Sequence, residues 1–443
     1  MDQPLYALSL MEALQGIRKR QFTSEAYTEV LLARIASLDG EIRAWTWLRP
    51  AEAIRAARLS DRHFQPGAVP GPLQGLPVGV KDIYATAGVP TEMGSSAFAG
   101  HIPNESAKVI ERLEARGAFV MGKTVTTECA FYSPGKTRNP WNPLHTPGGS
   151  SSGSAAAVAA GFIPAALGTQ TNGSIIRPAA FCGVVGFKPT QGPIPIEGAL
   201  TFSHTLDQVG VFTRHVEDAA WLAASLTGDG AKLSPSICTR STPPCLAAVR
   251  TPVWEQAEAH ARQNFSENIR MLREGGAHVE EVDLPEIFNH AQRVIRTIMA
   301  VEAAMNLEDL YLKQAPLISP TLKDFITEGR GVAALAYLQA LKLRLAMKEE
   351  LERFMERYDA LVTPPTTGEA PATLEHTGNP CFCSIWSLCG VPAIAIPVGF
   401  GPRGLPLGLQ IVGPTGKDDQ ALSSALWCER LFSLPPSRLL QPA

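Results

Sequence analysis

The sequence predicts an α/β protein: a single large α/β/α sandwich built around one mostly buried sheet. Three observations lead to this fold class. Short apolar runs bounded by Gly and Pro alternate with segments of helical spacing along the whole chain. The 443 residues are 45% hydrophobic, which is enough to bury a large core. The alternation shows no internal repeat and no low-complexity tail, so the pattern favours one intimate domain.

Each expected strand is an apolar run that ends near Pro or Gly. These runs lie at 118–122, at 184–187 and within 75–88 and 361–373, where we expect functional loops at the strand ends. The expected helices show apolar spacing on one face or a run of small residues. They lie at 6–39, ending at Asp39–Gly40, and at 106–116, 153–160, 216–227, 255–275 and 334–358.

The stretch 229–247 has loop composition and separates a glycine-rich half from a helix-rich half. We interpret it as a boundary between subdomains of one domain spanning 1–443. The first part is a catalytic core at about 65–215. The second, at about 248–443, is rich in helices and completes the substrate pocket.

Composition excludes several classes of function. The net charge is −3 and the pI is near 6.3, so no global basic field attracts nucleic acid or an anionic membrane. No window approaches the roughly 20 apolar residues that cross a bilayer, and the N-terminus does not resemble a signal peptide. We therefore expect a cytoplasmic protein with a small-molecule substrate, no nucleic-acid or membrane partner, and a monomeric or homodimeric state.

The eight cysteines form no CxxC pair and have no His partners at zinc spacing. We expect them to be mostly small buried hydrophobic residues, with no metal site and no cofactor. They lie at 129, 182, 238, 245, 381, 383, 389 and 428.

Residues 117–124 (GAFVMGKT) satisfy the GxxxxGK[ST] pattern of phosphate-binding loops. That mechanism needs a flexible loop whose N–H groups surround phosphates. Here the four intervening residues form the expected apolar strand, so we reject phosphate binding.

The most informative segment is 147–190, where two Ser/Gly-rich loops (GGSSSGS and GTQTNGS) flank a buried helix and strand. Buried loops normally carry unpaired backbone groups. Two buried loops of this kind would be explained if their backbone N–H groups converged on one pocket.

At this segment the chain resembles the amidase signature hydrolases. The resemblance begins at 75–82 (GLPVGVKD), continues through 122–131, peaks at 147–190, resumes at 204–210 (HTLDQVG) and ends at 390–413. It implies a central mixed, twisted β-sheet covered by helices. It also implies a Ser–Ser–Lys triad in which Ser174 is the nucleophile, Lys81 the base and Ser150 the relay, preceded by a cis peptide bond. The implied oxyanion donors are the backbone N–H groups of Thr171, Asn172, Gly173 and Ser174.

The chemistry explains these residue types. A serine hydroxyl attacks a carbonyl only when a base takes its proton. Lys81 acts as a base only as a neutral amine, so burial must lower its pKa by roughly 2–4 units from about 10.4. Ser150 then passes the proton from Ser174 to Lys81.

The chain departs from the common signature DTGGS, which here reads Gln170-Thr171-Asn172-Gly173-Ser174. The arginine that usually follows the serine by two positions follows by three, at Arg177. This pattern resembles the branch typified by malonamidases, where the shifted arginine is implied to touch an acidic substrate group. The alternative is that Arg177 ties the loop together, because arginine serves both purposes.

The acyl pocket is expected to draw on the loop at 128–142 and on the C-terminal third. Aromatic walls would suit bulky or aryl substrates better than a dicarboxylate. The residues expected to bind substrate are Gly149, Arg177, Cys129, Phe131, Tyr132 and Gln170, with Trp141, Ile194, Ile196, Phe202, Cys381 and Trp386 as further pocket candidates.

The resemblance implies an amidohydrolase that cleaves C–N bonds of amides and anilides, with carbamates (urethanes) and esters as possible further substrates of the acyl-enzyme route. The alternative is an amidotransferase subunit that releases ammonia from glutamine for a partner handling charged tRNA.

Overall fold

The computed structural model describes residues 3–64, 69–228, 242–432 and 440. Within these residues the strands form one eleven-stranded sheet in the order β1-β3-β2-β4-β6-β5-β10-β11-β9-β7-β8. The pairing is mixed. Strand β2 runs parallel to β3 and β4, and β7 runs parallel to β8 and β9. The neighbours in the central run of the sheet, β4-β6-β5-β10-β11-β9, pair antiparallel. The predicted α/β fold with a central mixed sheet is confirmed.

The strands are short, and most of their residues are buried. Their bounds are β1 Trp45–Leu48, β2 Pro77–Lys81, β3 Phe119–Thr124, β4 Ala165–Gln170, β5 Val185–Lys188, β6 Gln208–Thr213, β7 Cys245–Arg250, β8 His278–Asp283, β9 Ala360–Thr363, β10 Ala393–Phe400 and β11 Pro406–Val412.

The helices differ widely in length, from the six residues of α13 to the 22 residues of α12 at the edge of the molecule. Their bounds are α1 Leu10–Arg18, α2 Ser24–Ile42, α3 Pro50–Asp61, α4 Lys108–Ala115, α5 Ser152–Ala159, α6 Ile176–Cys182, α7 Val216–Leu226, α8 Ala259–Glu274, α9 Ala291–Asn306, α10 Glu308–Gln314, α11 Pro320–Gly331, α12 Ala334–Met355, α13 Ser384–Cys389 and α14 Asp418–Phe432.

The helix expected over 6–39 is two helices. The chain breaks after α1, where Arg20 takes φ 55°, and the Thr23 side chain caps the start of α2 by accepting a hydrogen bond from the N–H of Ala26. Helix α2 then continues past Gly40 to Ile42 and ends where Arg43 adopts a left-handed conformation.

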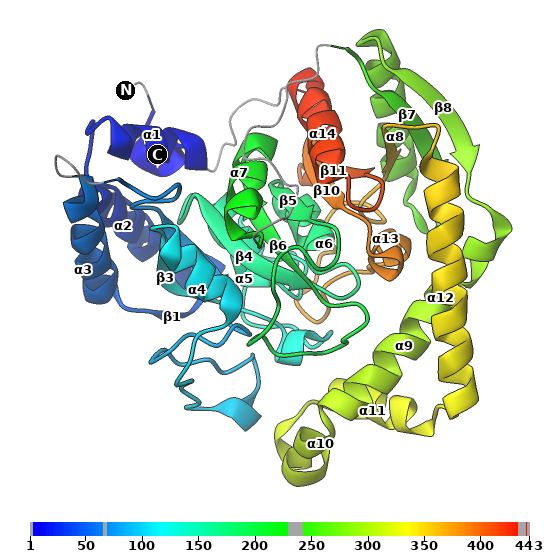
Figure 1. The fold of residues 1–443 in the computed structure, drawn as a ribbon, viewed down its shortest axis with the longest axis horizontal. Helices are drawn as coiled ribbons and strands as arrows, with labels where there is room; N and C mark the ends of the chain where they lie inside the picture. Colours follow the sequence, from blue (N-terminus) through cyan, green and yellow to red (C-terminus); the bar gives the residue numbers. More distant parts are fainter. Residues whose placement is uncertain (1–2, 65–68, 229–241, 433–439, 441–443) are drawn as a thin grey trace.

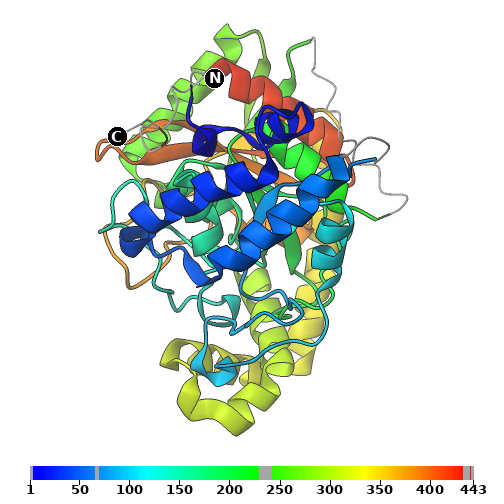
Figure 2. The same cartoon turned by 90° about the vertical axis from the view of Figure 1, so that its left-hand side faces the viewer.

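Helices cover the sheet in two groups. Helices α5 and α6 pack against each other, with α5 also on β2 and β4 and α6 on β5, β10 and β11, while α7 and α14 pack together on β6 and β10. Helices α9 to α12 form an arm that projects beyond the sheet at the lower right of Figure 1. Figure 2 shows α1, α2 and α3 lying across the opposite flank.

The sheet runs unbroken across both predicted parts of the chain, because β5 of the glycine-rich half pairs with β10 of the helix-rich half. Most of the loop proposed at 229–247 falls on 229–241, which lie outside the described residues. Its last residues differ from the expectation, since Cys245 already begins β7.

Candidate active site

Strand β2 delivers Lys81 to the centre of the molecule, where its side chain is completely buried. Its Nζ donates hydrogen bonds to Ser150 Oγ at 2.7 Å and to Thr169 Oγ1 at 2.9 Å. Burial lowers the pKa of Lys81 to about 7, and the charge of Asp207 opposes this shift. The amine therefore has a large neutral fraction near neutral pH.

The loop before α5 holds Ser150 against Lys81. The Gly149–Ser150 peptide bond is cis, as the resemblance implies. The Ser150 carbonyl accepts a hydrogen bond from Thr127 N–H at 3.2 Å, and Ser151 Oγ donates to the Thr169 carbonyl at 3.2 Å. These contacts join the loop to β4.

The second Ser/Gly-rich loop is a turn between β4 and α6. Gln170, the last residue of β4, accepts hydrogen bonds through Oε1 from the N–H groups of Ile175 at 2.7 Å and Ile176 at 3.0 Å. In the part of the chain that the structure describes, no hydrogen bond has the N–H of residues 171–174 as its donor. The turn thus leaves four consecutive N–H groups free beside a cavity.

The cavity at this turn is narrow, with a volume of about 10 Å³ and room for about one water. The lining residues are Ala130, Phe131, Tyr132, Thr171, Asn172, Gly173, Ser174, Arg177, Phe202, Met299 and Pro380.

Ser174 lines this cavity and is 8% exposed. The hydrogen bonds among the described residues include the contact of Lys81 with Ser150 but none between Ser150 and Ser174. Catalytic hydrogen bonds are often long before substrate binds.

Aromatic rings form one wall of the cavity. Phe131 stacks on Phe202 with ring centroids 5.3 Å apart and also contacts Tyr132 and Phe325. The unusual backbone before it sets this position, because Cys129 and Ala130 both have positive φ. The loop 128–132 therefore directs three residues, Ala130 to Tyr132, into the cavity.

Arg177 lines the cavity, but its guanidinium is bound to the protein. It donates to the carbonyls of Gly378 and Gly149, both at 2.7 Å, and to Thr377 Oγ1 at 3.1 Å. Burial lowers its pKa, and none of the ion pairs among the described residues includes it. This geometry is that of a loop tie.

Several other predicted pocket residues are not among those that line this cavity. Trp141 donates from its ring to the Cys182 carbonyl, Gln170 supports the turn, and Gly149 and the buried Cys129 do not line the cavity. The remaining candidates that it does not reach are Ile194, Ile196, Cys381 and Trp386. We predicted these residues from their apolar character, and most of them are buried in the hydrophobic core.

Sequence reasoning missed the residues that support the turn from behind. Thr171 Oγ1 donates to the buried Asp207 carboxylate at 2.6 Å, which also accepts from the N–H groups of Phe202 and Ser203. Burial raises the pKa of Asp207 to about 6. The single acid within the segment 201–212 was the available signal.

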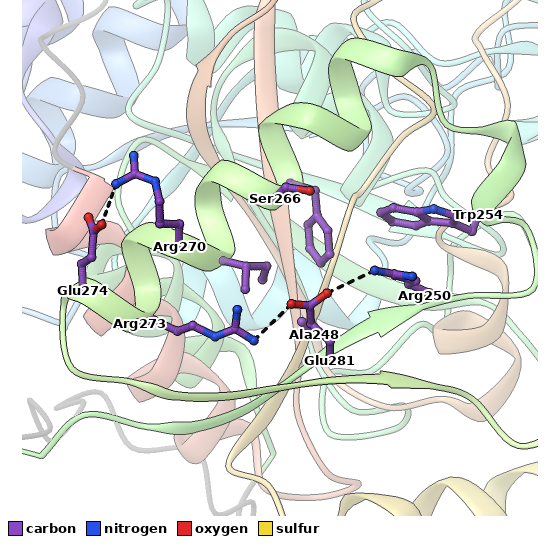
Figure 3. A pocket seen from close by; sticks show the side chains of 10 residues that line it. Ala248, Arg250, Trp254, Ser266, Arg270, Arg273, Glu274 and Glu281 are labelled. Atoms are coloured by element: carbon purple, nitrogen blue, oxygen red, sulfur yellow. Dashed lines mark hydrogen bonds and ion pairs between the residues drawn. The ribbon is translucent and has the colours of Figure 1, made fainter.

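Two other features carry no candidate site. Lys123 of the GK[ST] pattern is buried, donates to Thr91 and Thr86 and lies 3.6 Å from Asp82, so it is not a phosphate ligand. A separate cavity of about 210 Å³ opens between β7, β8 and α8 (Figure 3). Its arginines are already paired, Arg250 and Arg273 with Glu281 and Arg270 with Glu274.

Within the described residues, no helix has the length and apolar character needed to cross a membrane, and no group of three or more His, Cys, Asp or Glu residues is placed to hold a metal ion. Six of the seven described cysteines are buried, and Cys238 lies outside the described residues.

Curated relatives match nearly the whole chain. A glutamyl-tRNA(Gln) amidotransferase subunit of Halothermothrix orenii is 32% identical, covering 98% of this chain and 99% of the relative. The protein of the same name from Symbiobacterium thermophilum is 35% identical, covering 90% and 91%. The expectation of a small-molecule partner alone, with no nucleic acid and at most a homodimer, is therefore wrong: these relatives are subunits of an enzyme named for a charged tRNA.

Solved structures share the fold. One described as an amidase is 31% identical with a TM-score of 0.87, covering 96% of this chain and 99% of that one. The peptide amidase of Stenotrophomonas maltophilia is 28% identical with a TM-score of 0.84, covering 98% of this chain and all of that one. The family described as Amidase matches residues 26–422. The triad pattern, the eleven-stranded sheet and this match together show that the chain belongs to the amidase family.

Proposed function

We propose that this protein cleaves the C–N bond of an amide by transferring the acyl group to Ser174, with Lys81 as the base and Ser150 as the proton relay. One observation carries the proposal: the completely buried Lys81 Nζ donates a hydrogen bond to Ser150 Oγ at 2.7 Å. A lysine with its pKa lowered to about 7 is available as a neutral base, which an ordinary lysine is not.

In the proposed reaction, Ser174 Oγ attacks the carbonyl carbon while its proton passes through Ser150 to Lys81. The negative charge on the carbonyl oxygen is stabilised by the free N–H groups of residues 171–174. The C–N bond then breaks, and the proton held by Lys81 returns to the leaving nitrogen. A water or another acceptor later removes the acyl group from Ser174.

In this proposal the two parts of the domain have different roles. The core at about 65–215 supplies the triad and the turn, and the part at about 248–443 completes the cavity with Met299 and Pro380.

The names of the curated relatives favour one version of this step. In it the amide is glutamine, Ser174 takes the γ-glutamyl group, and the ammonia passes to a partner that acts on a charged tRNA. The high coverage of both chains supports this version, because the match spans nearly all of each relative's length.

The lining of the cavity favours a second version, in which water accepts the acyl group of an amide with an apolar acyl portion. Phe131, Phe202 and Met299 give the cavity apolar walls. Glutamine brings an α-ammonium and an α-carboxylate, yet no carboxylate side chain of the described residues lines the cavity and Arg177 is bound to loop carbonyls. Aryl amides, anilides and carbamates suit these walls.

The test is to incubate the purified chain with glutamine, with acyl 4-nitroanilides and with N-aryl carbamates, and to measure released amine and the mass of the intact protein. Ser174→Ala is the matched control. Release of amine together with an acyl adduct on Ser174 supports the proposal. Adduct formation with glutamine supports the amidotransferase version, and adduct formation with anilides alone supports the hydrolase version. Absence of both amine and adduct with every substrate would refute the shared step.

A further inference from the structure

Asn172 places an amide side chain where the common signature of the family carries glycine. It lies two residues before Ser174 in the turn and lines the same cavity. A glycine here contributes only its backbone N–H, whereas asparagine also adds a carbonyl acceptor and an NH₂ donor to the site.

Two serines of α13 fix this asparagine. The Ser384 hydroxyl lies 2.8 Å from Asn172 Oδ1, closer than its two other acceptors, Gln292 Oε1 at 3.2 Å and the Pro380 carbonyl at 3.4 Å. Ser387 Oγ donates to the Asn172 main-chain carbonyl. Both serines are completely buried and one helical turn apart, so they act from the same face of α13. The shortest of the Ser384 contacts places Asn172 Oδ1 toward α13.

This orientation leaves the NH₂ group of Asn172 as the free end of the side chain. Among the hydrogen bonds of the described residues none has Asn172 Nδ2 as its donor. Nδ2 is also not one of the fully buried polar atoms that lack a partner, and Asn172 lines the cavity. Thr171 and Arg177, two other polar side chains of the cavity, are already bound to Asp207 and to loop carbonyls.

We propose that the Asn172 NH₂ group selects substrates by donating a hydrogen bond to an acceptor oxygen on the acyl group. The substrate class is an amide whose acyl portion combines an apolar body with an oxygen close to the scissile carbonyl, such as an alkoxyacyl, oxoacyl or alkoxycarbonyl (carbamate) group. The apolar body fits the Phe131 and Phe202 wall. This inference rests on the proposed acyl transfer to Ser174.

The experiment compares two isosteric substrates, methoxyacetyl and butanoyl 4-nitroanilide, which differ by an ether oxygen in place of a methylene. The quantity measured is the kcat/KM of the methoxyacetyl anilide divided by that of the butanoyl anilide. Dividing the wild-type ratio by that of a variant cancels the different intrinsic reactivity of the two anilides.

Asn172→Gly, which restores the common residue, is expected to lower this ratio about 3- to 10-fold, the usual worth of one neutral hydrogen bond. Asn172→Asp keeps the acceptor for Ser384 but replaces the NH₂ donor by an oxygen, so it should lower the ratio at least as much. Ser384→Ala should lower it partly, because the amide loses its orientation. Asn104→Asp makes the same chemical change at an exposed site and should leave the ratio unchanged.

An unchanged ratio in both Asn172→Gly and Asn172→Asp, with thermal unfolding showing folded proteins, would overturn the inference while leaving acyl transfer to Ser174 intact. If the wild type turns over neither anilide and forms no acyl adduct with either, this inference falls, and the proposed function falls with it only if glutamine and N-aryl carbamates also give neither amine nor adduct. The two failures are therefore distinguishable.

Discussion

Lys81 Nζ and Ser150 Oγ lie 2.7 Å apart, and neither side chain is more than 2% exposed. The pair connects the end of β2 to the loop before α5. A buried amine that donates to a hydroxyl and lacks a contacting carboxylate among the described residues is poised to take up a proton, because burial disfavours its charged form.

The first prediction concerns this pair and the nucleophile. Ser174→Ala should abolish turnover, and Ser150→Ala and Lys81→Ala should each lower kcat/KM at least about 10²-fold, since each carries the transferred proton. Lys108→Ala removes an exposed lysine and serves as the control. Near-normal rates in Lys81→Ala would contradict the assignment of the base.

The second prediction is the pH dependence. The active form is neutral Lys81, whose pKa lies at about 7. Activity should therefore rise about tenfold per unit below pH 7 and level off above it. The measurement is kcat/KM from pH 5.5 to 9 on a neutral anilide. A flat profile from pH 6 to 9, with chemistry limiting the rate, would exclude lysine as the base.

The third prediction concerns the effect of the Asp207 charge on the pKa of Lys81. Its negative charge raises the pKa of Lys81, against the larger effect of burial. Asp207→Asn removes this charge, so the lower limb of the kcat/KM profile should move to lower pH. A purely structural loss would reduce the plateau without moving the limb. A shift toward higher pH would contradict the coupling.

The sequence pointed to the residues proposed to carry the chemistry more readily than to the residues that position them. The resemblance of the motifs at 75–82 and 147–190 to the amidase signature implied the roles of Lys81, Ser150 and Ser174. The fold class followed from the alternation of apolar strands and helices. Both inferences use information that is local along the chain.

Long-range contacts carry no such local signal. Ser203 and Thr205 are held by the buried Glu302 of α9, and this contact positions the loop that bears Phe202. Neither helix α9 nor this contact was predicted, because the pairing depends on how α9 packs against α11, α12 and α13. Apolar residues such as Trp386 were equally ambiguous, since core and pocket favour the same residue types.

The fourth prediction tests Arg177 as a loop tie. Arg177→Ala leaves the carbonyls of Gly149 and Gly378 without their donor, which should lower the free energy of unfolding by about 2–5 kcal/mol. Activity should fall on charged and neutral substrates alike. The measurements are thermal unfolding and kcat/KM on dicarboxylic monoamides and on neutral anilides. A tenfold rise in KM confined to the monoamides would support contact with a substrate carboxylate instead.

The last prediction concerns the support of the oxyanion turn. Ser387 Oγ donates to the Asn172 carbonyl and accepts from Gln170 Nε2 at 2.9 Å, so one hydroxyl joins the start and the middle of the turn to α13. Removing it in Ser387→Ala frees the turn without touching the triad. Because the N–H donors act mainly on the charge that develops in the transition state, kcat should fall about tenfold while KM changes little.

Ser225→Ala is a suitable control for Ser387→Ala, since Ser225 is also a buried helical serine. Among the described residues its hydroxyl bonds only within α7, to the Trp221 carbonyl. That variant should keep wild-type kcat and KM. If Ser387→Ala instead raises KM and leaves kcat unchanged, the serine shapes substrate binding rather than the oxyanion turn. Rescue of kcat by Ser387→Thr, which retains the hydroxyl, would show that the hydrogen bonds and not the volume of the side chain are responsible.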